Sequence, residues 1–199
     1  IENFSQAAVQ LVEAVGTKTN VLLGHSLGAL IGPNATNRTE AIHGLVLSAG
    51  AAGFATRTPE EQEIYIKERI EPIENGMSIA DYARPQLFRM MSDDASGPLV
   101  DHVVDVVLSM EAQTFVDSIR AITLYDSRPE LKTVTKPTLL IAGREDPTCT
   151  PEGMEKMHGM IKGSEFHVIE GAGHYGFAEK PQAYKALLLG WLQNHFPTS

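Results

Sequence analysis

Short apolar runs alternate with amphipathic stretches at both ends of the chain. Buried strands are predicted at residues 21–23, 44–48, 137–142 and 165–169. Helices are predicted at residues 3–15, 27–37, 152–161 and 181–196, although Gly32 and Pro33 fit poorly inside the second of them. This alternation is typical of an α/β fold, in which helices cover both faces of a mostly parallel sheet.

The middle of the chain does not follow this alternation. Amphipathic stretches recur at residues 59–76, 78–91, 98–110 and 112–127, and none of the apolar runs between them predicts a strand. We therefore expect an all-helical insertion between the second and third strands. The predicted organisation is an α/β core made of residues 1–53 and 133–199, with a helical lid made of residues 54–132.

Charge and composition narrow the classes of partner. The chain carries 16 basic and 25 acidic residues, a net charge of −9, and no basic cluster, which argues against nucleic acid or an anionic membrane as partner. No apolar run approaches the roughly 18–20 residues of a membrane span, and no signal-peptide pattern is present. Cys149 is the only cysteine, so an internal disulfide is excluded. We expect a cytoplasmic protein that acts on a small molecule.

The stretch Gly24-His25-Ser26-Leu27-Gly28 follows the first predicted strand and precedes a helix. It fits a simple tight turn, but strand–Gly-x-Ser-x-Gly–helix is also the context of a nucleophile elbow. Such a turn lifts the serine hydroxyl clear of the sheet, and the helix points its first amides at the reacting centre. The sequence thus predicts Ser26 as a nucleophile and the Leu27 amide as an oxyanion donor.

A serine hydroxyl needs a base to take its proton. Of the seven histidines, His174 alone lies on a glycine-rich loop directly after a predicted strand. The base in turn needs an acid, and Asp146 follows the third strand immediately before Pro147, with Glu145 as the competing choice. Ser26, Asp146 and His174 would then meet at the carboxyl ends of the strands. Tyr175 is either a wall of the substrate pocket or a packed aromatic side chain.

The chain resembles α/β-hydrolases of the small esterase, enol-lactonase and cofactor-free haloperoxidase type. The matching pieces are VLLGHSLGA, GLVLSAG, LKTVTKPTLLIAGREDPTCTPEGM and GSEFHVIEGAGHYGFAEKPQAYKALLLGWL. The resemblance implies Ser26 as nucleophile, Asp146 as acid and His174 as base. It implies hydrolysis of a small carboxylic ester or lactone through an acyl-enzyme, with no metal or organic cofactor. It also implies that residues 54–132 form the lid that sets substrate choice.

Members of that family begin with further strands and a loop that supplies a second oxyanion donor. This chain starts inside the helix before the elbow, so we expect a longer protein or a second chain that completes the sheet. Three alternative functions remain open. The same site could catalyse perhydrolysis or carbon–carbon bond hydrolysis, the triad could belong to a small-molecule receptor, or the chain could be an inactive fragment.

Overall fold

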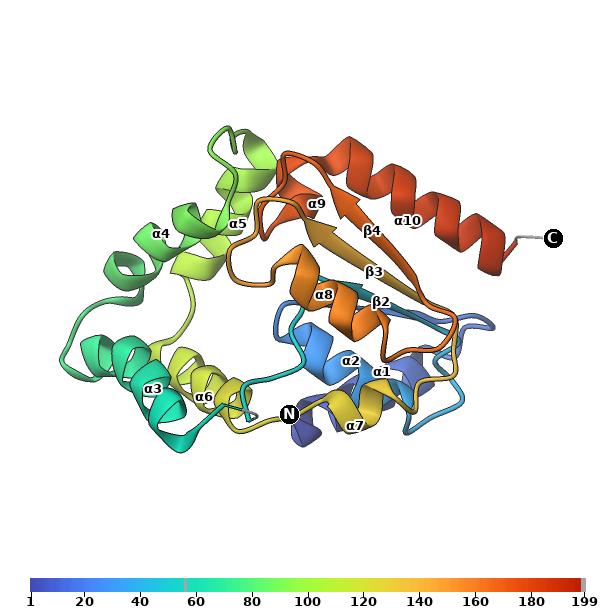
Figure 1. Cartoon of the computed structure of the whole chain (residues 1–199), viewed down its shortest axis with the longest axis horizontal. Coiled ribbons are helices and arrows are strands. Elements are labelled where there is room, and N and C mark those ends of the chain that lie inside the picture. Colours follow the sequence, from blue (N-terminus) through green and yellow to red (C-terminus); the bar gives the residue numbers. More distant parts are fainter. Residues whose placement is uncertain (56, 198–199) are drawn as a thin grey trace.

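The computed structural model describes residues 1–55 and 57–197. A four-stranded sheet lies at its centre (Figure 1). The strands lie side by side in chain order: β1 (Val21–His25), β2 (Gly44–Ser48), β3 (Thr138–Gly143) and β4 (Glu165–Ile169). Every neighbouring pair is parallel, which confirms the predicted class of sheet. Their carboxyl ends therefore meet at one edge.

Helices cover both faces of the sheet, as predicted. The longer helices of this part are α1 (Glu2–Val15), α2 (Gly28–Thr36), α8 (Pro151–His158) and α10 (Pro181–His195). On one face, Leu45 and Leu47 pack with residues of α2 and α8. On the opposite face, Val46 and Ile141 pack with residues of α10. Alternate side chains of one strand thus enter two separate layers of the core.

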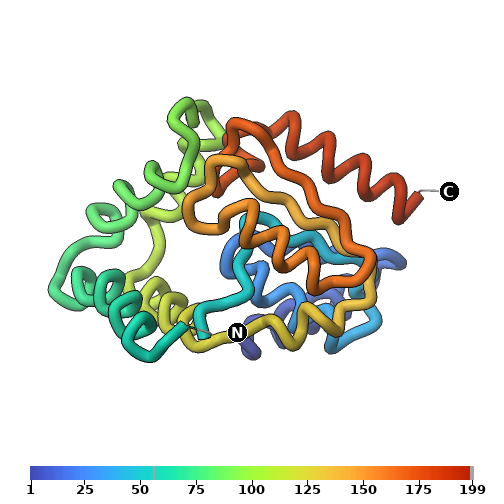
Figure 2. The backbone as a smooth tube through the Cα atoms, in the orientation of Figure 1, coloured from blue at the N-terminus to red at the C-terminus, as the bar shows by residue number. Residues whose placement is uncertain are grey.

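The residues between β2 and β3 form a set of helices, and no strand occurs within the described part of that stretch. The longer ones are α3 (Pro59–Glu74), α4 (Ile79–Met90), α5 (Pro98–Leu108) and α6 (Ala112–Thr123), and residues 59–123 are here called the helical segment. It lies beyond the carboxyl ends of the strands rather than over a face of the sheet (Figures 1 and 2). The division into core and lid stays a prediction, and residue 56 of the lid and residues 198–199 of the core lie outside the described residues.

Local capping explains where the first two of these helices begin. The Thr58 hydroxyl accepts a hydrogen bond from Glu61 N–H at 3.2 Å, and the Glu61 carboxylate accepts one from Thr58 N–H at 2.8 Å. This reciprocal capping box satisfies backbone donors that the helix itself leaves free. At the start of α4, the Ser78 hydroxyl accepts a hydrogen bond from Asp81 N–H at 3.1 Å.

The chain enters and leaves the helical segment at one narrow point. Gly53 pairs with Asp126 in an isolated antiparallel bridge, and Ser127 N–H donates to the carbonyl of Ala52 at 2.9 Å. Gly53 has a φ of 98°, and a Cβ there would lie 2.0 Å from the carbonyl oxygen of Tyr125. Only glycine fits this close approach. We call residues 52–53 and 125–127 the clasp.

Three helices differ from the sequence-based expectation. Helix α2 runs through Gly32 and Pro33, and a Cβ on Gly32 would lie 2.9 Å from Leu45 Cδ1, so this glycine serves close packing on the sheet. Two short helices, α7 (Arg128–Leu131) and α9 (Gly176–Glu179), were not predicted. Among the described helices, none has the length and apolar character needed to span a membrane.

Candidate active site

Ser26 occupies the sharp turn between β1 and α2. Its φ is 53°, in the left-handed region that residues other than glycine seldom adopt. A Cβ on Gly24 would lie 2.1 Å from the carbonyl oxygen of Gly28, so the turn requires glycine at position 24. Ser26 N–H donates to the carbonyl of Ser48 at 3.0 Å, which ties the turn to β2. Strain of this kind, held in place by its surroundings, is typical of functional sites.

The second glycine of the motif has no such steric reason. A Cβ on Gly28 would meet no described atom within 4 Å, so close packing explains the glycine at position 24 but not the one at position 28. Helix α2 begins at Gly28, directly after Leu27. Within residues 1–55 and 57–197, Leu27 N–H donates to no backbone carbonyl, and Leu27 lines the same cavity as Ser26. Its amide is therefore available to a bound molecule.

His174 and Asp146 form a buried pair at the ends of β4 and β3. His174 Nδ1 lies 2.7 Å from Asp146 Oδ2, and the two residues are 3% and 2% exposed. The other carboxylate oxygen, Oδ1, accepts hydrogen bonds from the amides of Thr148 at 2.8 Å and Cys149 at 2.9 Å. The neighbouring Glu145 is exposed. Of the two acids that the sequence left open, the structure brings Asp146 to the histidine.

Opposing effects act on the pKa of Asp146. Burial by itself raises it, because a low-dielectric surrounding disfavours the charged form. The hydrogen bond and charge of His174, together with the amides of Cys149 and Thr148, outweigh burial and lower the pKa below its ordinary value. The carboxylate is therefore ionised at neutral pH, and His174 Nδ1 carries the proton of their hydrogen bond.

His25, inside the elbow, lies beside His174. The two ring centroids are 4.9 Å apart. Burial, followed by the charge of His174, lowers the pKa of His25 to about 4. His25 is therefore neutral at pH 7 and places no positive charge beside the His174 ring. The sequence placed His25 in the elbow but carried no signal for this contact.

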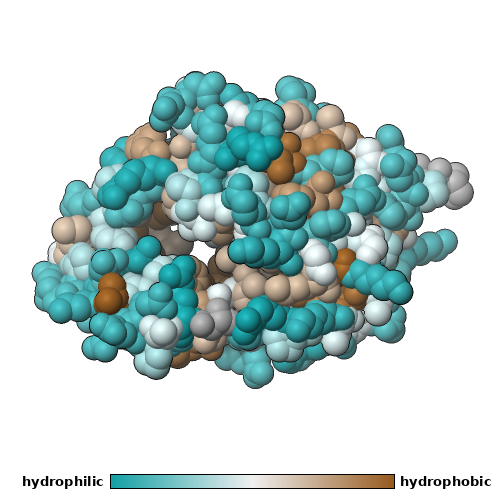
Figure 3. Space-filling model, in the orientation of Figure 1, coloured by the Kyte–Doolittle hydropathy of each residue, from teal (hydrophilic) through white to brown (hydrophobic). Residues whose placement is uncertain are grey.

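Ser26 and His174 line one cavity of 380 Å³, as do Leu27 and Tyr175. Figure 3 shows the surface hollowed between the helical segment and the rest of the molecule. The apolar side chains that the helical segment contributes to this inner cavity include Leu87, Val107, Phe115, Ile119 and Ile122. Burial, then the charges of Asp146 and Glu179, raise the pKa of Tyr175 to about 12, so its phenol is neutral. The structure thus places Tyr175 at the cavity wall.

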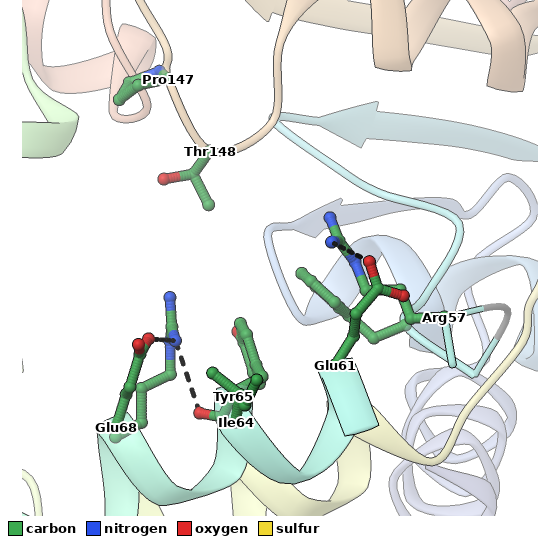
Figure 4. A pocket seen from close by; sticks show the side chains of 9 residues that line it. Arg57, Glu61, Ile64, Tyr65, Glu68, Pro147 and Thr148 are labelled. Carbon is green, nitrogen blue, oxygen red and sulfur yellow. Dashed lines mark hydrogen bonds and ion pairs between the residues drawn. The ribbon is translucent and has the colours of Figure 1, made fainter. Parts of the chain in front are cut away.

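A second, outer cavity of 400 Å³ adjoins the inner one and shares Tyr65, Arg69, Pro147 and Thr148 with it. Its walls are charged: Arg57 lies 3.9 Å from Glu61, and Arg69 lies 3.7 Å from Glu68. Figure 4 shows Arg57, Glu61 and Glu68 on α3 and beside it, across the opening from Pro147 and Thr148. A cavity with charged walls thus adjoins the more apolar cavity that Ser26 lines.

One group of side chains has the spacing of a metal site. Ligand atoms of Asp146, Cys149 and His174 lie within 4.8 Å of one another, and all three residues are buried. The Asp146 carboxylate is already shared between His174 and two backbone amides. Burial, and then the charge of Asp146, raise the pKa of the Cys149 thiol. A protonated thiol is a poor metal ligand, so the group fits a hydrogen-bonded pair better than a metal centre.

Comparison with known proteins identifies the family of this chain and several similar proteins. The profile of the "Alpha/beta hydrolase family" matches residues 2–187. A proline iminopeptidase of Lactobacillus helveticus is 38% identical over 71 residues, which are 36% of this chain and 24% of that protein. The 3-oxoadipate enol-lactonase 1 of Acinetobacter baylyi is 29% identical over 63% of this chain and 48% of its own length. A pimeloyl-[acyl-carrier protein] methyl ester esterase of Neisseria meningitidis is 29% identical over 83% of this chain and 66% of its own length.

Solved structures show the same fold. An esterase from Exiguobacterium antarcticum superposes with a TM-score of 0.82 at 21% identity, covering 95% of this chain and 72% of that one. A bromoperoxidase from Bacillus anthracis gives a TM-score of 0.83 at 19% identity, with coverage of 95% and 72%. The first curated relatives are matched over only about a quarter of their length, 24% of the Lactobacillus helveticus protein.

Proposed function

From the premise that this chain belongs to the alpha/beta hydrolase family, we propose that it carries the site of a serine hydrolase that cleaves a small carboxylic ester or lactone. The observation that carries the proposal is that His174 and Ser26 line the same cavity. His174 is hydrogen-bonded to the buried Asp146, and Ser26 has a strained backbone. An enol-lactonase and a methyl ester esterase are among the similar proteins, and the activities of these relatives support the ester or lactone class.

In the proposed reaction, the Ser26 hydroxyl oxygen attacks the carbonyl carbon while His174 Nε2 accepts the hydroxyl proton. Asp146 holds the Nδ1 proton and stabilises the imidazolium. The Leu27 N–H donates to the negatively charged oxygen of the tetrahedral intermediate. His174 then returns the proton to the departing alcohol oxygen, leaving an acyl group on Ser26. Water, deprotonated by His174, hydrolyses this acyl-enzyme and regenerates the serine.

The helical segment is proposed as the part that selects the substrate. It supplies most of the apolar wall of the inner cavity, and a hydrophobic wall discriminates between acyl groups by size and shape. The inner cavity of 380 Å³ suits a small molecule rather than a polymer.

Covalent labelling with a fluorophosphonate probe tests the proposal directly. The probe forms a stable adduct only with a serine that a base activates in an assembled site. We expect one adduct per chain by intact-mass spectrometry and none in Ser26→Ala. Ser118, which lines the same cavity from the helical segment, provides a matched control, and Ser118→Ala should label like the wild type.

A panel of p-nitrophenyl esters, methyl esters and lactones then identifies the substrate class. We expect turnover of at least one ester or lactone and its loss in Ser26→Ala. A wild-type chain that stays unlabelled, or a Ser26→Ala variant that labels as before, would show that Ser26 is not the nucleophile. Stoichiometric labelling without turnover of any ester or lactone would instead favour the receptor function.

A further inference from the structure

Glu179 places a buried carboxylate directly behind the loop that carries His174. Its side chain belongs to α9 and the residue is 9% exposed. Oε1 accepts a hydrogen bond from Tyr175 N–H at 2.8 Å, and Oε2 accepts one from Gly173 N–H at 2.9 Å. Both residues that flank His174 in the chain are thus hydrogen-bonded to one carboxylate.

The same carboxylate also reaches the helical segment. Oε2 accepts a third hydrogen bond, from Ser92 N–H at 2.7 Å, just after the end of α4. Beside it, His174 N–H donates to the carbonyl of Met90 at 2.7 Å. The two backbones pass so closely that a Cβ on Gly173 would lie 2.4 Å from the Met90 carbonyl oxygen. Residues 90–92 and 173–175 are therefore joined at four backbone amides.

We propose that Glu179 is a positioning residue for His174, and that it sets the histidine against the end of α4. The inference rests on the proposed function, because it assigns His174 the role of base. Glu179 acts through backbone amides and touches no reacting atom. Leu87 and Met90 of α4 line the inner cavity. A substrate that packs on α4 therefore contacts the helix end whose backbone is hydrogen-bonded to His174.

The three hydrogen bonds require a side chain that accepts at both of its terminal atoms. Each carboxylate oxygen offers more than one lone pair, so a single glutamate can accept from three N–H groups. A glutamine presents one oxygen and one NH₂ group, and the NH₂ would face at least one backbone N–H with no acceptor between them. Buried donors left unpaired in this way are costly, so the loop should move to pair them.

An exposed ion pair between the same two segments provides a matched control. Lys180 Nζ lies 2.9 Å from Asp94 Oδ2; Asp94 lies two residues after Ser92, and Lys180 is the residue after Glu179. Asp94→Asn therefore removes a surface contact between these segments while leaving the buried carboxylate intact. Because exposed pairs contribute little, Asp94→Asn isolates the effect of the buried one.

The experiment compares wild type, Glu179→Gln, Glu179→Asp and Asp94→Asn by two readouts. The first is the rate constant and final extent of fluorophosphonate labelling of Ser26. The second is the low-field proton NMR signal of the His174 Nδ1–H···Asp146 hydrogen bond, which needs no substrate. For Glu179→Gln we expect a labelling rate constant ~10- to 100-fold lower at unchanged final extent, because a displaced base loses its alignment. The low-field signal should shift or broaden.

Glu179→Asp keeps the charge and should recover part of the rate, and Asp94→Asn should label within about twofold of the wild type. If Glu179→Gln matches the wild type in rate constant and in the low-field signal, the proposal is wrong. It is equally wrong if only the final labelled extent falls, because that pattern means a smaller folded fraction with normal geometry. If Glu179→Gln does not fold, Glu179→Asp decides by the same criteria. Should wild-type Ser26 fail to label, the proposed function fails, while the low-field signal still tests the role of Glu179.

Discussion

The inner cavity has two walls of different construction. The wall at the strand ends carries Ser26 and His174, each held by backbone hydrogen bonds to a neighbouring segment. The facing wall belongs to the helical segment, where half-buried side chains such as Tyr82 and Phe115 contact each other, with ring centroids 5.4 Å apart. Backbone hydrogen bonds thus hold Ser26 and His174 in the first wall, whereas packed side chains determine the shape of the second. Substitutions at the strand ends should therefore affect all substrates alike, whereas substitutions in the helical segment should change the preference among them.

The largest effect expected in this comparison comes from Asp146→Asn. The substitution removes the charge that stabilises the imidazolium and allows the His174 tautomer to reverse, so kcat should fall about 10³- to 10⁴-fold for every ester tested, with KM little changed. Glu145→Gln alters the adjacent, exposed carboxylate and should leave the kinetics near the wild type. Steady-state assays on two esters of different acyl length make the measurement. Comparable losses in both variants, or a loss confined to one ester, would contradict the assignment.

A second effect concerns stability and pH at the strand-end wall. Unfolding frees His25, whose pKa then rises from about 4 to its ordinary 6.5. Between these values the unfolded chain binds more protons than the folded one, so the free energy of unfolding falls as the pH drops from 6.5 to 4. The contribution of His25 to this loss is about 3 kcal/mol at pH 4.

Urea denaturation of wild type and His25→Phe at pH 7 and pH 4 measures that contribution. The variant should lack this part of the acid loss, because phenylalanine keeps a ring in the same place and has no proton to gain. His102→Gln changes an exposed histidine and should keep the wild-type pH dependence. Identical acid sensitivity in His25→Phe and wild type would mean that His25 is not held neutral.

The smallest of these effects, in the helical wall, should be a change of preference. Ile122 lines both the inner cavity and a cavity of 60 Å³ that also borders Ser26 and Leu27. Ile122→Ala removes part of the side chain that lies between these two cavities and so enlarges the space next to Ser26. The ratio of kcat/KM for bulky acyl groups to kcat/KM for small ones should therefore rise about tenfold. Leu124→Ala, at a side chain 70% exposed, is the control. If kcat/KM of Ile122→Ala fell equally for all acyl lengths, Ile122 would affect the reaction as the strand-end wall does, and it would not select the acyl group.

Much of the strand-end wall could be predicted from the sequence because its signals are local. An apolar strand followed by Gly24-x-Ser26-x-Gly28 specifies the turn, and His174 and Asp146 each follow directly on a strand. Parallel strands bring such positions to one edge whatever separates them in the chain. The four strands and the helices of residues 59–123 were predicted for the same reason, since their periodicity lies within each element.

The rest depends on which segments meet in space. The pattern of apolar side chains on α6 shows which face is buried, but it does not show that Ile122 faces Ser26 across a cavity. Helix α9 has only four residues, too few to carry a periodic signal. Nothing near Glu179 in the chain indicates that its carboxylate accepts a hydrogen bond from the amide of Ser92, 87 residues away.

The close crossing at Gly173 bears on how such enzymes can be recombined. The clasp at residues 52–53 and 125–127 offers a natural pair of splice points for exchanging the helical segment with that of a relative. A graft made at those points alone would overlook a third attachment, where Met90 and Ser92 bond to the histidine loop and its carboxylate. A transplanted segment must therefore reproduce the backbone path at residues 90–92, or the recipient will gain a new pocket while the loop of His174 loses the contacts that hold it.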